Sequence, residues 1–145
     1  MKQEYVCGFL FNPERRSVVL IQKNRPEWQK GRLNGVGGHI DNDIEHTYPA
    51  VAMSREFEEE TDVKIIPNDW FPLIELTDKR NWKVYFFTAF ADKKQWNSIK
   101  QTTDEIIVKV RLDFLARSNT IYNLQWLIPL ALDNDIPKPL ILKEI

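Results

Sequence analysis

Three glutamates at helical spacing are the residues of this sequence best suited to chemistry. In the segment Arg55-Glu56-Phe57-Glu58-Glu59-Glu60, a helix of about 3.6 residues per turn places Glu56, Glu59 and Glu60 within one arc of about 100°. Like charges three and four residues apart repel each other, and the helix dipole disfavours anions near its C-terminal end. Because Mg²⁺ prefers carboxylate oxygens, a bound divalent cation would offset this repulsion.

A solvated acidic face, which is common on surface helices, is the simpler alternative. The glycines upstream weigh against it, because Gly37 and Gly38 free a stretch of backbone to approach a ligand or metal a short loop before the helix. A calcium-binding loop that begins at Asp41 is excluded. The EF-hand pattern needs Gly at its sixth position and Glu at its twelfth, where this sequence has His46 and Ala52.

The elements that must position these residues are two helices within a mostly β chain. A helix is expected to begin near Thr47-Tyr48-Pro49 and to run to about Thr61, since proline is tolerated in a first turn. A polar stretch, residues 41–46, precedes it, and a second helix is expected over residues 121–132. Apolar runs predict strands over residues 6–11, 17–22, 70–76, 82–90 and 105–110, with a hairpin-like connection over residues 12–16. Residues 33–40 are expected to form a strand that enters a tight glycine turn. Together these elements indicate an α/β layered domain with a mixed sheet.

Composition narrows the class of protein. The chain has 145 residues and 43% hydrophobic residues, which suits a single domain over residues 1–145 with its own core. A net charge of −1 without a polybasic stripe argues against binding a nucleic-acid polymer, but not against a small phosphorylated ligand. The apolar stretch over residues 5–11 is too short to cross a membrane. Cys7, the single cysteine, is expected to be buried and inert, and the default location is the cytoplasm.

The segment from Gly38 to Val63 resembles the Nudix box. That family's pattern is Gly, five residues, Glu, seven residues, then Arg-Glu-apolar-x-Glu-Glu-x-Gly-apolar, and residues 55–60 match its core residue for residue. Residues 23–28 and 33–38 are similar to the strand and loop that enter the family's box. Residues 123–129 are similar to the family's last helix, so the resemblance covers most of the chain.

Three departures from the pattern lie around the helix. Six residues separate Gly38 from Glu45 and nine separate Glu45 from Arg55, so the loop and the helix start carry three extra residues. This insertion leaves the role of Glu45 open. Asp62 stands where the pattern has its closing Gly, at a position expected to be left-handed, which Asp tolerates better than most residues.

The resemblance implies an α/β/α sandwich with a mixed sheet and a hydrolase that cleaves a phosphoanhydride bond in a nucleoside diphosphate derivative. Mg²⁺, with Mn²⁺ as a substitute, is its expected cofactor. By resemblance the metal ligands are Glu59, Glu60 and the backbone carbonyl of Gly37, while Glu56 ligates the metal or deprotonates the attacking water. Arg55 is expected to orient a glutamate, and Gly38 to support the site.

A glutamate from a later loop serves many family members as a base or an extra ligand. Glu105 is the candidate here, which makes Glu56, Glu59 and Glu105 the expected catalytic residues, with Asp104 as the second choice. The alternative is that two exposed acids simply precede a strand. His39 and His46 have no partners at zinc-site spacing and receive no ligand role.

Substrate recognition is expected from the residues around the box. Residues 31–38 look similar to a strand of oxidised purine nucleoside triphosphatases in which the Asn faces the base, so Asn34 is a candidate, with Asn123 or Trp126 beside it. Lys23 is a candidate for the phosphates. The alternatives are that Trp126 belongs to the core, that Asn123 caps a helix, and that Lys23 is merely solvated.

The resulting prediction is a nucleoside triphosphate pyrophosphatase that releases monophosphate and pyrophosphate. Cleavage of ADP-ribose or a nucleotide sugar is the second activity considered, and a nucleotide-sensing Nudix domain without catalysis is the third. The expected partner is a small nucleotide substrate, and a homodimer is compatible with this picture.

Overall fold

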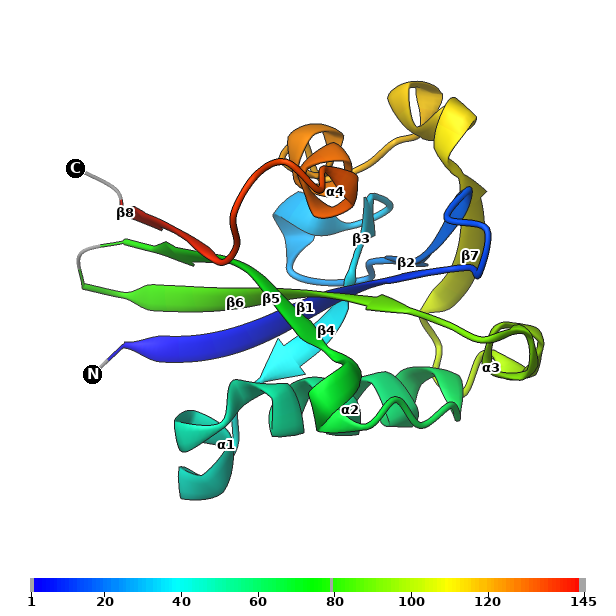
Figure 1. Cartoon of the computed structure of the whole chain (residues 1–145). Coiled ribbons are helices and arrows are strands. Elements are labelled where there is room, and N and C mark those ends of the chain that lie inside the picture. Colours follow the sequence, from blue (N-terminus) through cyan, green and yellow to red (C-terminus); the bar gives the residue numbers. More distant parts are fainter. Residues whose placement is uncertain (1, 79, 144–145) are drawn as a thin grey trace.

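A mixed sheet with helices on both faces forms the framework of the chain (Figure 1). The computed structural model describes residues 2–78 and 80–143. Within these ranges the strands are β1 (Gln3–Phe11), β2 (Ser17–Gln22), β3 (Leu33–Asn34), β4 (Val36–His39), β5 (Phe71–Thr77), β6 (Trp82–Phe90), β7 (Ile106–Arg111) and β8 (Leu140–Lys143). Their order is β3-β2-β1-β6-β5-β8, with β4 paired to β1 and β7 paired to β2.

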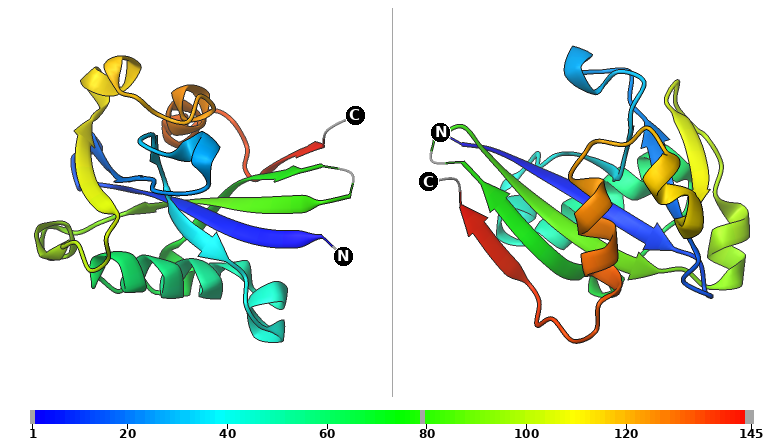
Figure 2. Two further views of the ribbon diagram at one scale, coloured as in Figure 1. Left: turned by 180° about the vertical axis from the view of Figure 1, so that it is seen from behind. Right: turned by 90° about the horizontal axis from the view of Figure 1, so that it is seen from above.

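Both parallel and antiparallel pairs occur in this sheet. Strand β1 runs parallel to β6 and antiparallel to β4, and β5 runs antiparallel to β6 but parallel to β8. Helices α1 (Asp43–Thr47) and α2 (Pro49–Thr61) lie on one face, whereas α4 (Leu124–Leu132) lies on the other (Figures 1 and 2). The short helix α3 (Lys93–Ser98) follows β6. The predicted α/β/α sandwich with a mixed sheet is therefore confirmed.

The core consists of two apolar clusters, one on each face of the sheet. The alternation of side chains along β1 divides them, since Val6 and Leu10 belong to the cluster under α2, and Cys7 and Phe9 to the cluster under α4. Phe57 of α2 is fully buried in the first cluster. This packing fixes which side of α2 faces the sheet and thus where its glutamates lie. No helix in residues 2–78 and 80–143 has the length and apolar character needed to cross a membrane.

Most of the predicted elements are present, several with shifted bounds. The strands over residues 17–22 and 82–90 and the helix that ends at Thr61 are confirmed. Helix α4 begins at Leu124 rather than at residue 121, because the N–H of Ile121 donates to the carbonyl of Leu33 and keeps that segment extended beside β3. Helix α1 was not predicted, although Asn42 caps it by accepting a hydrogen bond from the N–H of Glu45.

The predicted glycine turn within residues 33–40 is wrong. Two short strands, β3 and β4, occupy this segment. Gly37 and Gly38 lie in the extended backbone of β4. The glycines serve close approach instead of a turn. A Cβ on Gly37 would lie 1.9 Å from the carbonyl oxygen of Val6 on β1, and one on Gly38 would lie 2.5 Å from a carboxylate oxygen of Glu56.

These two glycines predict different effects of alanine. Gly37→Ala should destabilise the fold by about 1–3 kcal/mol or more, because the methyl group meets backbone that cannot turn aside. Gly38→Ala should cost less stability, because it meets the end of a side chain that can rotate away. Urea unfolding of both variants tests this, and equal midpoints for the two would contradict it.

Candidate active site

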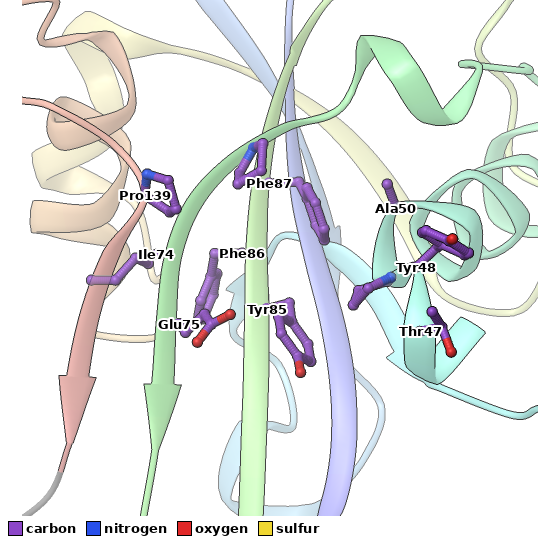
Figure 3. Close-up of a pocket in the computed structure, with 11 residues that line it drawn as sticks. Thr47, Tyr48, Ala50, Ile74, Glu75, Tyr85, Phe86, Phe87 and Pro139 are labelled. Carbon is purple, nitrogen blue, oxygen red and sulfur yellow. The ribbon is translucent and has the colours of Figure 1, made fainter. Parts of the chain in front are cut away.

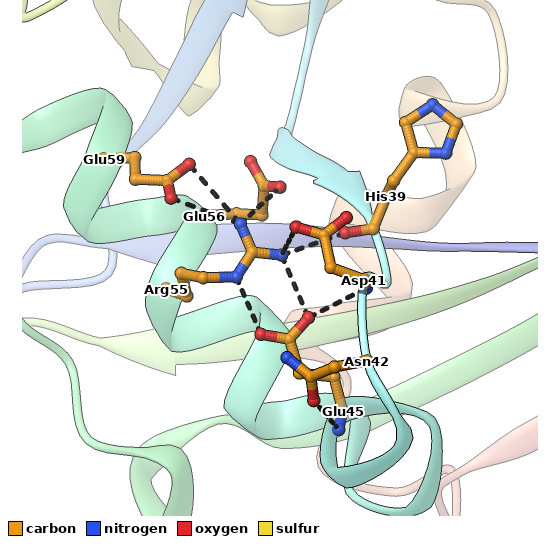
Figure 4. A network of polar contacts seen from close by, with 7 residues as sticks. All are labelled: His39, Asp41, Asn42, Glu45, Arg55, Glu56 and Glu59. Carbon is orange, nitrogen blue, oxygen red and sulfur yellow. Dashed lines mark hydrogen bonds and ion pairs between the residues drawn. The ribbon is translucent and has the colours of Figure 1, made fainter.

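Arg55 lies at the centre of a polar network on α2 (Figure 4). Its Nε donates to one carboxylate oxygen of Glu45 at 2.7 Å, and its Nη2 donates to the other at 3.0 Å. Its Nη1 lies 3.0 Å from Glu56 and 3.3 Å from Glu59. Its Nη2 also donates to the carbonyl of His39 at 3.0 Å. One planar guanidinium thus links the α1 carboxylate, the end of β4 and two of the predicted metal ligands.

Helix α1 lies in the segment that carries the extra residues, and it brings Glu45 to Arg55. From this helix the Glu45 side chain, 3% exposed, points back toward α2. The N–H of Asp41 donates to the same carboxylate at 3.0 Å. The hydrogen bond from Arg55 holds the pKa of Glu45 below its usual range. The role of Glu45 that the sequence left open is thus a structural pairing with Arg55.

Glu56 lies over the glycines of β4. Its side chain is 13% exposed and fills the space that a Cβ on Gly38 would take. Burial raises the pKa of Glu56, and Arg55 offsets only part of this effect, while the charges of Glu59 and Glu60 add to it. Glu56 is therefore a carboxylate whose negative charge lacks full compensation. Glu59, which is 58% exposed, forms the open side of the cluster.

Glu60 faces the segment before β7. Burial raises its pKa, and the charge of Glu105 raises it further, whereas a hydrogen bond from Thr103 and the charge of Lys23 lower it. The Thr103 hydroxyl donates to Glu60 at 2.9 Å. Sequence analysis did not identify Thr103, because a threonine in a polar loop carries no signal of its own.

Glu105 and Lys23 form an ion pair. Lys23 Nζ is 3.5 Å from one oxygen of Glu105, and the N–H of Asn24 donates to the other at 3.0 Å. The charge of Lys23 also lowers the pKa of Cys7, although burial dominates and raises that pKa to about 12. Lys23 is therefore connected to the glutamates of α2 through Glu105 and Thr103, since Thr103 contacts both the backbone of Glu105 and the carboxylate of Glu60.

Asn34 lies next to Cys7. Its Oδ1 accepts from the N–H of Gly35 at 2.8 Å and from the thiol of Cys7 at 3.8 Å, and its Nδ2 donates to Gln29 at 3.1 Å. The amide is therefore engaged within the protein. One Nδ2 hydrogen remains for a further acceptor.

Asn123 is the N-cap residue of α4, next to the segment that pairs with Leu33. It therefore takes the cap position of the helix-cap alternative, but its side chain makes no capping hydrogen bond. Its Oδ1 is buried and has no hydrogen-bond partner among the described residues. An unpaired buried carbonyl is costly and calls for an N–H donor.

Trp126 lies one turn after Asn123 on α4, and its backbone N–H donates to the carbonyl of Asn123 at 3.2 Å. It is 41% exposed, so it is not a core residue, and it lines a hollow of about 390 Å³ between α4 and the C-terminal segment. A second hollow of about 330 Å³ lies where α2 begins, and Tyr48, Tyr85 and Phe87 contribute to its walls (Figure 3). None of the glutamates of α2 lines either hollow.

The glutamates of α2 fit a hard divalent cation by their donor chemistry. They offer oxygen donors alone, and the raised pKa values of Glu56 and Glu60 mark negative charge that a cation would relieve. In residues 2–78 and 80–143, no three side chains of His, Cys, Asp or Glu are gathered around one point. Arg55 draws Glu56 and Glu59 toward itself, and Thr103 holds Glu60.

Comparison with known proteins identifies the family. Residues 1–119 match the model of the NUDIX domain, and the chain therefore belongs to the Nudix family. No curated protein matches the sequence significantly.

Solved structures share the fold at low sequence identity. A structure from work on MutT of Aliivibrio salmonicida and Vibrio cholerae has a TM-score of 0.71 at 17% identity, over 91% of this chain and 98% of its own. The NUDIX domain of Shewanella oneidensis NrtR, complexed with ADP ribose, has a TM-score of 0.65 at 17% identity, over 90% and 86%. A NUDIX-family hydrolase from Clostridium perfringens has a TM-score of 0.67 at 16% identity, over 92% and 97%.

The Glu45–Arg55 pair predicts a pH-dependent stability difference. Because the pKa of Glu45 is lowered in the folded state, its ionised form stabilises the fold above the carboxylate's ordinary pKa, and this contribution is lost as the pH falls through the lowered pKa. Glu45→Gln should thus destabilise the protein by about 2 kcal/mol at neutral pH, with little difference in strong acid. Denaturant unfolding across pH measures this, and a pH-independent difference would show that the charge of Glu45 is immaterial.

Proposed function

We propose that this Nudix protein hydrolyses a nucleoside triphosphate to the monophosphate and pyrophosphate. The observation that carries the proposal is the meeting of two groups of residues. Glu60 of α2 is joined through Thr103 to Glu105, which pairs with Lys23, and Lys23 directly follows β2, the strand paired with β3 and its Asn34. A phosphate chain over the first group would leave its nucleoside over the second.

Mg²⁺, or Mn²⁺ in its place, would be held by Glu56, Glu59, Glu60 and the backbone carbonyl of Gly37. When bound, the cation neutralises phosphate oxygens and stabilises the negative charge of the transition state. Arg55 keeps two of these glutamates on one side of the helix through its contacts with Glu56 and Glu59.

The remaining side chains have separate tasks. Glu105 is the proposed general base, which accepts a proton from the water that attacks the phosphorus atom. Its carboxylate is held on one oxygen by the N–H of Asn24, which orients the other. Lys23, which lies 3.5 Å from Glu105, binds a phosphate oxygen of the substrate. Attack on phosphorus breaks the phosphoanhydride bond, and pyrophosphate leaves.

Asn123 is the proposed reader of the base. Its Oδ1, which is buried and has no partner among the described residues, would accept a hydrogen bond from an N–H of a purine edge after a rotation of the side chain exposes it. Asn34 is held by its hydrogen bonds with Gly35 and Gln29, and one of its amide hydrogens is left for the base. We assign Trp126 no part in base recognition, because it lines the separate hollow beside β8.

Cleavage of ADP-ribose is the second candidate activity. It is favoured by the likeness in fold to the NUDIX domain of NrtR, which was solved with ADP ribose. A panel of nucleotides with Mg²⁺, scored for pyrophosphate or monophosphate release, separates the two. Equal activity on ADP-ribose and on triphosphates would remove the preference for the triphosphatase.

The glutamate cluster predicts opposite effects on stability and activity. Removing one charge by Glu60→Gln should raise the melting temperature of the metal-free protein near neutral pH, because the raised pKa of Glu60 means that its ionised form destabilises the fold there. The same variant should lose turnover by about 100-fold or more and should gain less from added Mg²⁺ in thermal unfolding.

Glu58→Gln is the matched control for this test. Glu58 is exposed on the same helix, so both its turnover and its response to Mg²⁺ should stay at the wild-type level. Wild-type turnover in Glu60→Gln at saturating Mg²⁺ would remove Glu60 from the site.

Base recognition predicts a loss that depends on the substrate. Asn123→Ala should lower kcat/KM for the preferred purine triphosphate by a factor that corresponds to about 1–3 kcal/mol of transition-state stabilisation. A poor pyrimidine substrate should be affected little, since only the purine meets the lost carbonyl. Asn34→Ala should lower activity on all bases, with a larger loss for the purine if its free amide hydrogen also contacts the base. A uniform loss in Asn123→Ala would show that this residue supports the helix and does not read the base.

A further inference from the structure

The loop of residues 101–105 is attached to the C-terminal end of α2. The N–H of Lys100, just before it, donates to the carbonyl of Thr61 at 3.1 Å, and the Thr102 hydroxyl donates to the carbonyl of Glu59. These carbonyls belong to the last turn of the helix, which has no partners for them within the helix itself. These hydrogen bonds therefore hold the loop beside the C-terminal end of α2 and its glutamates.

Thr103 makes two contacts of a different kind. Its hydroxyl donates to Oε2 of Glu60 at 2.9 Å and accepts from the backbone N–H of Glu105 at 3.2 Å. A hydroxyl can do both at once, because it has one hydrogen to donate and lone pairs to accept with. This single group thus connects the carboxylate of Glu60 with the backbone that carries Glu105.

The contact with Thr103 acts on a carboxylate that has few other constraints. Among the described residues, Thr103 provides the one hydrogen bond to the Glu60 side chain. Besides partial burial, the remaining influences on the pKa of Glu60 are charges of opposite sign: Glu105 and Glu59 raise it, and Lys23 lowers it. A hydrogen bond has a preferred direction that such charges lack, so it can select one rotamer of Glu60.

We propose that Thr103 is a positioning residue, which restrains the Glu60 carboxylate at the proposed metal site and keeps the backbone of Glu105 at a fixed distance from that carboxylate. The inference rests on the proposed function, because it assigns Glu60 to the metal and Glu105 to the attacking water. Outer partners of metal-binding carboxylates commonly change metal affinity by about 10–100-fold when they are removed.

Metal binding without substrate tests this directly. Mn²⁺ alone is titrated into the protein and followed by electron paramagnetic resonance of the free ion. Thr103→Val, which keeps the shape and removes the hydroxyl, should weaken Mn²⁺ binding by about 10-fold, and Thr103→Ser should restore it. Because Thr103 is exposed, neither change disturbs the core.

Thr102→Val is the matched control in the same loop. Its hydroxyl binds a backbone carbonyl and no carboxylate, so its loss should leave Mn²⁺ affinity within about twofold of wild type, a span smaller than most outer-partner effects. If Thr103→Val also lowers stability, the double variant with Glu60→Gln shows whether the lost affinity comes from the contact between the two residues. Affinity losses that do not add up indicate that the two residues act together, whereas additive losses contradict the inference.

The outcomes separate this inference from the proposed function. Wild-type Mn²⁺ affinity in Thr103→Val, together with loss of binding in Glu60→Gln, would overturn the positioning role and leave the metal site intact. Undiminished Mn²⁺ binding in Glu60→Gln would instead remove the metal site on which both proposals depend.

Discussion

The ion pair between Arg55 and Glu45 is the interaction on which the rest of the site depends. Helix α2 carries its glutamates close together, and an arrangement of that kind is unfavourable unless cations share the space. Arg55 supplies one positive charge, but a guanidinium that could move freely would pair with any nearby carboxylate. The two hydrogen bonds that Arg55 donates to Glu45 fix the plane of the guanidinium, and the direction of its remaining N–H groups toward Glu56 and Glu59 follows from that.

The close approach of β4 to its neighbours is the second constraint. Gly37 allows the strand to lie against β1, and Gly38 leaves room for the carboxylate of Glu56. A side chain at Gly37 would push β4 away from β1, and one at Gly38 would displace the carboxylate of Glu56. The glycine pair therefore belongs to the chemistry of the site, since it lets backbone and carboxylate oxygens come near each other.

Much of the framework could be predicted from the sequence, because periodicity reflects burial. The apolar positions of α2 and the long runs of β2 and β6 each have one dominant pattern, and the helix arc placed Glu56, Glu59 and Glu60 on one side. Asp62 takes the left-handed backbone expected of it, with φ 59°. Helix α1 was missed because its five residues are too short for a pattern. The glycines of β4 were misassigned because glycine marks a turn and a close approach alike.

The contacts made by the loops could not be predicted in the same way. The pairing of Lys23 with Glu105 and of Thr103 with Glu60 joins residues far apart in the chain, and neither has a local signal. The unpaired carbonyl of Asn123 likewise depends on which groups surround it after folding. The sequence suggested candidate site residues, but the fold alone determines which of their side chains come into contact.

The central claim is that this constellation hydrolyses a nucleoside triphosphate between its α and β phosphates. Phosphorus NMR of a purine nucleoside triphosphate incubated with the protein and Mg²⁺ tests it most directly, because each product has its own resonance. The account predicts equal amounts of nucleoside monophosphate and pyrophosphate. Release of orthophosphate and a nucleoside diphosphate, or an unchanged triphosphate spectrum at high protein concentration, would contradict it.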